Sequence, residues 1–260
     1  MPGAFRTIRV ESREGADWLT LDRPDSLNAL DEAMIGELGG YFEAAAARPE
    51  LRVIVLRGAG RSFCAGLDIR DVARRLEGLG TAGIYAVQRS LSRIIVAMRR
   101  CPQPVVALVQ GAASGGGFAL ALAADIRICT RDARMNAAFI KVGLSGCDVG
   151  VSYLLPRLVG ASVAAELMMT GRFLDAARAE RLGLVSTVVD PAGLDAAGEA
   201  LAQELLAASP LALAMTKQGI EANLGAASLE AAVALEDRQQ ALLCHAPEFA
   251  AALRAFLGRG

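Results

Sequence analysis

The sequence predicts an α/β core followed by a tail made only of helices. Short apolar, β-branched runs alternate with helical patterns up to residue 193, and the chain from 194 to 260 has helical patterns alone. Between Val105 and Asp125 the chain reads as a buried strand, a glycine turn and a helix. We therefore predict a core domain over 1–193 and a helical oligomerisation domain over 194–260.

The first elements predicted are a hairpin, a helix and a strand. Strand character over 5–11 and 17–21 surrounds a Gly-Ala turn signal, which is typical of a β-hairpin. Asp31 is a suitable N-cap for a helix over 32–47. A β-branched run over 52–56 predicts the next strand, which leads into the loop RSFCAGLDIRD.

A long helix is predicted over 82–100, before the central stretch. Its apolar residues recur at helical spacing, at Ile84, Val87, Leu91, Ile94, Ile95 and Met98. The preceding segment, 67–79, carries charges and glycines, so we expect it to be only partly helical.

The central stretch predicts a strand over 105–109 and a helix over 118–124, joined through Gly115, Gly116 and Gly117. Glycines at the mouth of a helix leave N–H groups unpaired, and the partial positive charge there suits an oxyanion. The alternative is that the glycines only let the helix pack tightly on the strand. The 24 residues between Arg100 and Asp125 carry no charge and are long enough to cross a bilayer. Their prolines, glycines and polar residues nevertheless favour a soluble strand–turn–helix.

The remaining elements follow from the same patterns. We expect strands over 126–130 and 184–189, a mixed segment over 135–142, a loop over 143–150, helices over 151–159 and 163–170, a short helix from an Asp175 cap to Gly183, and tail helices over 194–207, 211–222, 228–243 and 248–257.

Composition excludes several functional classes. The net charge of −1, with scattered basic residues, disfavours nucleic-acid and acidic-membrane partners. The five cysteines are odd in number and lack CxxC spacing, which indicates reduced thiols rather than disulfides or a metal site. The N-terminus has no apolar signal core, so we expect a cytoplasmic protein.

Four segments in order resemble the crotonase family, also called enoyl-CoA hydratase/isomerase. They are LDRPDSLNALD, RSFCAGLDIRD, ALVQGAASGGGFALALAADIRI and GVSYLLPRLVGASVAAELMMTGRFLDAARAERLGLVSTVV. The resemblance implies a spiral of ββα repeats that forms two sheets flanked by helices, followed by a C-terminal helical trimerisation domain. It also implies an acyl-CoA thioester as substrate, no metal or redox cofactor, and a homotrimer or dimer of trimers.

The resemblance also implies the residues of the site. The backbone N–H groups of Leu67 and Gly116 would form an oxyanion hole for the thioester oxygen. Further substrate and CoA contacts would come from Cys64, Ala65, Gly66, Asp68, Ile69, Gly115, Gly117, Ala119 and Phe139. Of these, Asp68 is expected to brace its loop rather than act as an acid.

The sequence departs from the hydratase pattern at both acids. Hydratases of the family use two glutamates, and the matching positions hold Ala119 and Phe139, which cannot move a proton. Asp148 matches an aspartate that dienoyl-CoA isomerases use for proton transfer, and the alternative is that it caps the next helix. The same aspartate is a nucleophile in a dehalogenase that also needs a histidine base, but the only histidine is His245, far along the chain.

We therefore expect double-bond isomerisation or another enolate reaction, with Asp148 as proton carrier. The alternatives are a hydratase with unusual acids and an acyl-CoA-binding relative that has lost its chemistry; RNA binding, seen in one crotonase branch, is disfavoured by the charge. Four residues have lesser assignments: Phe256, Arg259 and Lys217 as CoA contacts, and Cys147 as a packing residue.

Overall fold

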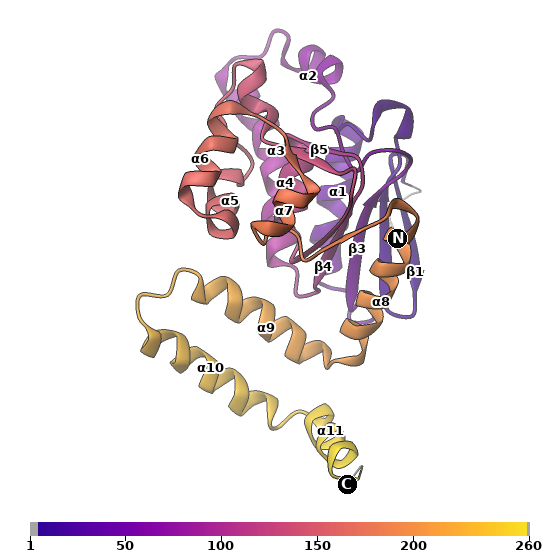
Figure 1. Cartoon of the computed structure of the whole chain (residues 1–260), viewed down its shortest axis with the longest axis vertical. Coiled ribbons are helices and arrows are strands. Elements are labelled where there is room, and N and C mark those ends of the chain that lie inside the picture. Colours follow the sequence, from indigo (N-terminus) through magenta and orange to yellow (C-terminus); the bar gives the residue numbers. More distant parts are fainter. Residues whose placement is uncertain (1–4, 259–260) are drawn as a thin grey trace.

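Two β-sheets form the centre of the computed structural model, which describes residues 5–258 (Figure 1). The larger sheet has the order β1-β2-β3-β4-β6-β9. Its strands are β1 (Ile8–Arg13), β2 (Ala16–Leu21), β3 (Val53–Gly58), β4 (Val105–Val109), β6 (Ile126–Thr130) and β9 (Thr187–Val189). The strands β2 to β9 of this sheet are parallel, and β1 pairs antiparallel with β2 as the predicted hairpin.

A second, three-stranded sheet has the order β5-β7-β8. Its strands are β5 (Ala112–Ser114), β7 (Arg134–Asn136) and β8 (Leu174–Asp175). The chain passes from β4 directly to β5 and from β6 to β7, so each pair gives one strand to each sheet before a helical segment follows. This is the ββα repeat that the resemblance implied.

Helices surround the two sheets. They are α1 (Glu32–Ala45), α2 (Ile69–Leu76), α3 (Thr81–Arg100), α4 (Gly116–Ala123), α5 (Val151–Val159), α6 (Ala161–Thr170), α7 (Ala176–Arg181), α8 (Leu194–Ala207), α9 (Pro210–Asn223), α10 (Leu229–Leu243) and α11 (Pro247–Leu257), with short 3₁₀ turns η1 (Pro24–Ser26), η2 (Ala138–Val142) and η3 (Pro191–Gly193). The predicted caps are confirmed, since Asp31 accepts from the Met34 N–H at 2.8 Å and Asp175 from the Arg178 N–H at 2.7 Å.

The larger sheet is covered on both faces, which explains its continuous apolar strands. In β3, Val53 and Val55 face α8, while Ile54 and Leu56 join the larger core with α1, α3 and α4. The helix α8 lies close to the sheet: an ideal Cβ on Gly198 would be only 2.5 Å from Leu108 Cδ1, so the glycine allows this approach. The predicted helix over 194–207 therefore covers the core sheet. The proposed helical oligomerisation domain over 194–260 stays a prediction.

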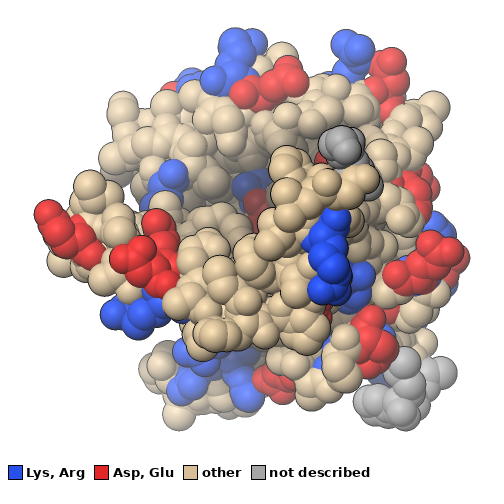
Figure 2. Space-filling model, turned by 90° about the horizontal axis from the view of Figure 1, so that it is seen from below, with Lys and Arg blue, Asp and Glu red and all other residues tan. Residues whose placement is uncertain are grey.

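The last three helices extend away from the sheets (Figure 1). Neither α10 nor α11 contains a buried residue in the described part of the chain. Figure 2 shows the molecule from this end, with much uncharged surface across the middle and most charged residues nearer the rim. Many large apolar side chains of α9, α10 and α11 are thus exposed in the described part of the chain.

Several short elements differ from the sequence prediction. The helix expected within 67–79 spans only Ile69–Leu76, and the mixed segment over 135–142 resolves into the end of β7 and the turn η2. The strands β5 and β8 have three and two residues, too short to show any periodicity in the sequence. Among the described residues, no helix has the length and hydropathy needed to cross a membrane.

Candidate active site

The loop CAGLD and the glycine turn before α4 lie side by side. The Cys64 N–H donates to Ala112 O, and the Ser114 N–H donates back to Cys64 O, both at 3.0 Å. Gly66 has φ +99°, and an ideal Cβ on it would lie 2.8 Å from Ser114 O and 3.6 Å from Gly116 N. Only glycine allows this approach, which brings the segments that carry Leu67 and Gly116 together.

The N–H groups of Leu67 and Gly116 have no hydrogen-bond acceptor within residues 5–258. Gly116 is the first residue of α4, so its N–H cannot bond within the helix. Leu67 pairs with Leu30 in an isolated parallel bridge. The two hydrogen bonds of this bridge run from the Leu30 N–H to Gly66 O and from the Asp68 N–H to Leu30 O, so neither uses the Leu67 N–H. Two free donors therefore stand on adjoining segments.

The helix α4 is fixed at both ends. At its start, an ideal Cβ on Gly117 would lie 2.1 Å from Cys64 O, so glycine is required where the helix crosses the loop. At its other end, the buried guanidinium of Arg127 donates to Ala124 O at 2.5 Å and to Leu184 O at 2.6 Å. Burial lowers the pKa of Arg127 to about 10, so the group stays cationic near neutral pH. A cation suits the negative end of a helix.

Asp68 braces its loop, as expected. Its carboxylate pairs with Arg23 at 3.0 Å and accepts from the Asp71 N–H at the start of α2. Burial alone would raise the pKa of Asp68, but the hydrogen bonds from Arg23 and Asp71 outweigh it and hold the pKa below its ordinary value. An acid held ionised in this way is poorly suited to donate a proton.

Asp148 lies in the loop before α5 and bonds to α3. Its Oδ1 accepts from the Val149 N–H at 2.8 Å and from Gln88 Nε2. Burial raises the pKa of Asp148, and these two hydrogen bonds offset that rise only in part. The N-cap position of α5 is Gly150, and no side chain caps it. The side chain of Asp148 thus does not cap the helix, although its backbone carbonyl accepts from the Val151 N–H at 2.8 Å.

The positions of the two missing glutamates are apolar and buried. Ala119 is fully buried in α4, and Phe139 in η2 is only 4% exposed. An ideal Cβ on Gly115 would lie 3.6 Å from Phe139 Cε1, so the ring packs against the glycine turn. Asp148 belongs to a separate loop, linked to this region because α3 and α5 both pack on α4.

The other predicted contacts differ in accessibility. Ile69 is 60% exposed at the start of α2, and Ala65 is partly exposed beside the Leu67 donor. Cys64 is fully buried, and burial raises the pKa of its thiol to about 12, so the thiol stays protonated near neutral pH. The backbone of Cys64 bonds to the segment 112–114. Phe256 is 79% exposed on α11, and Arg259 lies outside the described residues.

The suggested CoA contact through Lys217 is wrong. Lys217 is a buried residue of α9, and its ammonium group donates to Met98 O at 3.1 Å, Gln103 O at 2.9 Å and Asp125 Oδ2 at 2.9 Å. These acceptors use all three of its donors, and they join α9 to the end of α3. Lys217 is a structural anchor.

Sequence reasoning missed two polar residues that hold the site. Gln88 is the partner of Asp148, and it falls within the apolar spacing of α3, where a polar side chain is unexpected. Asn28 is fully buried, and its Nδ2 donates to Ala59 O at 2.9 Å and Ser62 O at 2.8 Å at the base of the CAGLD loop. Its place in the LDRPDSLNALD segment was the signal that could have found it.

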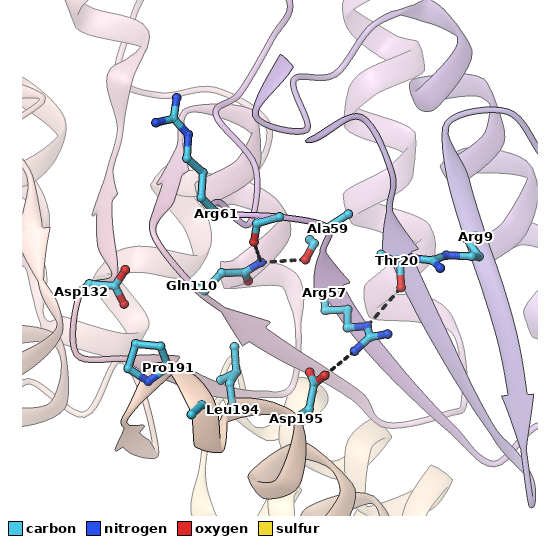
Figure 3. A pocket seen from close by; sticks show the side chains of 13 residues that line it. Arg9, Thr20, Arg57, Ala59, Arg61, Gln110, Asp132, Pro191, Leu194 and Asp195 are labelled. Atoms are coloured by element: carbon cyan, nitrogen blue, oxygen red, sulfur yellow. Dashed lines mark hydrogen bonds and ion pairs between the residues drawn. The ribbon is translucent and has the colours of Figure 1, made fainter. Parts of the chain in front are cut away.

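A polar pocket of about 510 Å³ opens at the carboxyl ends of the large sheet, beside α8 (Figure 3). Arg57 lies between Thr20 Oγ1, at 3.1 Å, and Asp195 Oδ2, at 2.8 Å. Gln110, just after β4, donates from its Nε2 to the O of Gly58, the last residue of β3, at 2.7 Å. This bond joins the starts of the loops that follow β3 and β4. None of the residues predicted for the site lines this pocket.

Known proteins were compared with this chain. The family model for enoyl-CoA hydratase/isomerase matches residues 11–260. A Mycobacterium tuberculosis protein named probable enoyl-CoA hydratase is 41% identical over 217 residues, which cover 82% of this chain and 76% of that protein. The 1,2-epoxyphenylacetyl-CoA isomerase of Escherichia coli is 33% identical and covers 95% of this chain and 93% of its own length.

Solved structures agree with the sequence matches. The enoyl-CoA hydratase/isomerase of Cupriavidus metallidurans superposes with a TM-score of 0.91 at 33% identity, over 99% of this chain and 95% of that one. The enoyl-CoA hydratase of Bacillus anthracis has a TM-score of 0.92 at 27% identity, over 98% and 97%. The predicted crotonase-like α/β fold is confirmed, and the chain belongs to the enoyl-CoA hydratase/isomerase family of acyl-CoA enzymes.

Proposed function

We propose that this protein moves a double bond in an enoyl-CoA thioester, with Asp148 as the proton carrier and the Leu67 and Gly116 N–H groups as the oxyanion hole. The observation that carries the proposal is the half-buried Asp148 carboxylate, whose Oδ2 has no hydrogen-bond partner among the described residues. Its raised pKa brings it nearer to the range in which a carboxyl can both accept and donate a proton.

The reaction needs one base and one site for negative charge. Asp148 takes a proton from the α-carbon of a 3-enoyl thioester, so that a C–H bond breaks and an O–H bond forms. The electron pair moves into a dienolate, whose oxygen receives hydrogen bonds from the two backbone N–H groups. The same carboxylic acid then returns its proton to the γ-carbon, and the double bond ends next to the thioester.

The two backbone donors suit this charge because they need no rearrangement. Gly66 and Gly117 hold the loop and α4 at close contact. Loss of one such donor typically costs about 2.7–4 kcal/mol in the transition state. For CoA we propose contacts from Ala65, Asp68 and Ile69 on the loop and from Phe256 of a neighbouring subunit, whereas Cys64, Gly115, Gly117, Ala119 and Phe139 would shape the walls.

Hydration is the second candidate, because relatives carry the name enoyl-CoA hydratase. Addition of water by the usual family route needs a second acid to position the water. Ala119 and Phe139 supply none, and both are buried among apolar residues. Isomerisation needs only one proton-carrying carboxylate, which Asp148 would supply, and it requires neither a metal nor a redox cofactor.

The remaining proposals concern the assembly. The apolar residues left exposed on α9 to α11 support a homotrimer or a dimer of trimers. We also propose that the protein works in the cytoplasm on a soluble thioester, without nucleic-acid or membrane partners.

The proposal is tested with purified protein and 2-enoyl, 3-enoyl and dienoyl thioesters. Asp148→Asn keeps the shape of the side chain and removes the base, so turnover should fall by about 10²–10⁴-fold while CoA affinity changes little. Ser92→Ala, on α3, is the control and should keep turnover. Full turnover in Asp148→Asn would reject the proton-carrier role. A wild type that binds all three thioesters without converting them would favour the relative without chemistry.

A further inference from the structure

Gln88 is a polar residue on the apolar side of α3. The helix carries Ile84, Leu91, Ile95 and Met98 at spacings of three, four and seven, and Gln88 falls into this series one turn after Ile84. Its side chain is partly buried, and its Nε2 donates to Asp148 Oδ1. Burial of an amide on this face is costly unless its hydrogen bonds are made, so the contact with Asp148 offsets the cost of the polar residue.

The loop that presents Asp148 is strained at the next residue. Val149 has φ +37°, which is unfavourable for a β-branched side chain. This backbone directs the Val149 N–H to Asp148 Oδ1 at 2.8 Å. Strain of this kind persists only where the surroundings fix the conformation, and it is frequent at functional sites. Gln88 and the strained turn are thus two independent restraints on the same oxygen.

The two carboxylate oxygens therefore differ. Oδ1 accepts from Gln88 and Val149, whereas Oδ2 accepts from no atom within residues 5–258. Burial raises the pKa of this carboxyl, and the hydrogen bonds from Val149 and Gln88 lower it. No charged side chain of the described residues contributes to the shift. Because Oδ1 is occupied, an incoming proton has its free acceptor on Oδ2.

We propose that Gln88 is a positioning residue, which holds Asp148 Oδ1 so that Oδ2 is the oxygen that exchanges the proton with the substrate. This inference rests on the proposed function of Asp148 and adds the residue that orients it. Gln88 can donate to Oδ1 of the ionised carboxylate and, more weakly, of the protonated carboxyl, so the orientation is kept through both halves of the proton transfer.

The first test needs no substrate. The ¹³C carboxyl signal of Asp148, in protein labelled at aspartate and assigned by its loss in Asp148→Asn, is titrated in wild type and in Gln88→Leu. Leucine removes a donor that favours the ionised form, so the pKa of Asp148 should rise. Gln88→Glu should raise it further, because two neighbouring carboxyl groups resist double ionisation. The control is Ser92→Ala: the Ser92 hydroxyl donates only to the backbone O of Gln88, at 3.1 Å, so its loss should leave the titration of Asp148 unchanged.

The second test is kinetic. Gln88→Leu should lower kcat by about 10-fold or more, with little change in KM, because a misoriented base affects the chemical step. The acidic limb of its pH profile should move in the same direction as the NMR titration. A variant that is folded but shows the wild-type pKa of Asp148 would overturn the inference. Full turnover in Asp148→Asn would instead reject the proposed function, and the titration would still decide whether Gln88 holds the carboxyl.

Discussion

At the residue scale, Asp148 shows how a site can work against stability. Its carboxylate is half-buried, and no cation pairs with it in the described chain. Asp68, by contrast, is held ionised by Arg23 and has a lowered pKa. The two aspartates thus have opposite pKa shifts, because Asp68 is paired with a cation and Asp148 is not.

Asp148→Asn should therefore make the protein more stable near neutral pH. The folded pKa of Asp148 lies above its ordinary value of 3.8, so the stability that its protonated form provides is full below that value and is lost as pH rises through the folded pKa. Asparagine carries no charge and can still accept from Gln88 and Val149. The melting temperature of the variant should exceed that of wild type at neutral pH, and the gap should shrink towards about pH 4.

Thermal unfolding at a series of pH values measures this difference. A variant with a lower melting temperature than wild type at neutral pH would show that the buried carboxylate stabilises the fold, and the prediction would be wrong.

The motifs of the sequence named the candidate site residues, whose roles stay predictions, but the motifs did not indicate the residues that support them. Asp148, Leu67 and Gly116 stand within recognisable strings, whereas Gln88 lies 60 residues from its partner in a helix that reads as ordinary amphipathic structure. A contact between residues so far apart depends on how α3 and the loop before α5 pack, and a single sequence does not contain that geometry.

At the element scale, α4 and the CAGLD loop act as one unit. The helix starts at Gly116, and the loop crosses it at Gly117 and Gly66. The sequence predicted the strand β4 and the helix of this region, although α4 begins at Gly116 rather than at residue 118. It did not predict β5, β7 and β8, since strands of two or three residues are defined by their partners rather than by their own residues.

Gly117→Ala should damage stability and turnover together. The added Cβ would lie 2.1 Å from Cys64 O and 2.7 Å from Cys64 Cβ, so α4 must move away from the loop. Overpacking of this kind typically costs about 1–3 kcal/mol. The displacement should also separate the Gly116 and Leu67 donors and lower kcat.

Gly36→Ala provides the matched control, because nothing lies within 4 Å of an ideal Cβ at this exposed position in α1. It should stabilise the protein by about 0.4–1 kcal/mol and leave turnover unchanged. Denaturant unfolding and steady-state kinetics compare the two variants. Equal effects of both substitutions would contradict the close contact between α4 and the loop.

At the scale of the whole molecule, the single chain leaves apolar surface uncovered. The large apolar side chains exposed on the last three helices are Leu211, Ile220, Leu229, Val233, Leu242, Phe249, Leu253, Phe256 and Leu257, and Leu224 is exposed at the C-cap of α9. The sequence predicted these helices from their composition. It could not predict that α8 packs on the sheet while α9 to α11 extend away, because all four have similar Ala- and Leu-rich patterns.

We expect the chain to form a trimer or a dimer of trimers through this surface. Sedimentation of a dilute sample should show a species well above the 27.1 kDa of one chain. Replacing Leu229 and Phe256, which are 76% and 79% exposed, by glutamate should weaken the assembly. Arg70→Glu, an exposed change on α2, should leave it intact. A wild-type chain that sediments only as a monomer would count decisively against this prediction.

The most direct test of the proposed chemistry is mass spectrometry and NMR of the product formed from a 3-enoyl thioester in D₂O. Isomerisation through Asp148 predicts a 2-enoyl product without added water. Deuterium enters its γ-carbon only to the extent that the protonated Asp148 exchanges with the solvent before it returns the proton. Asp148→Asn should lose both the product and the exchange. A product heavier by one water, formed equally by wild type and Asp148→Asn, would contradict the proposed isomerisation.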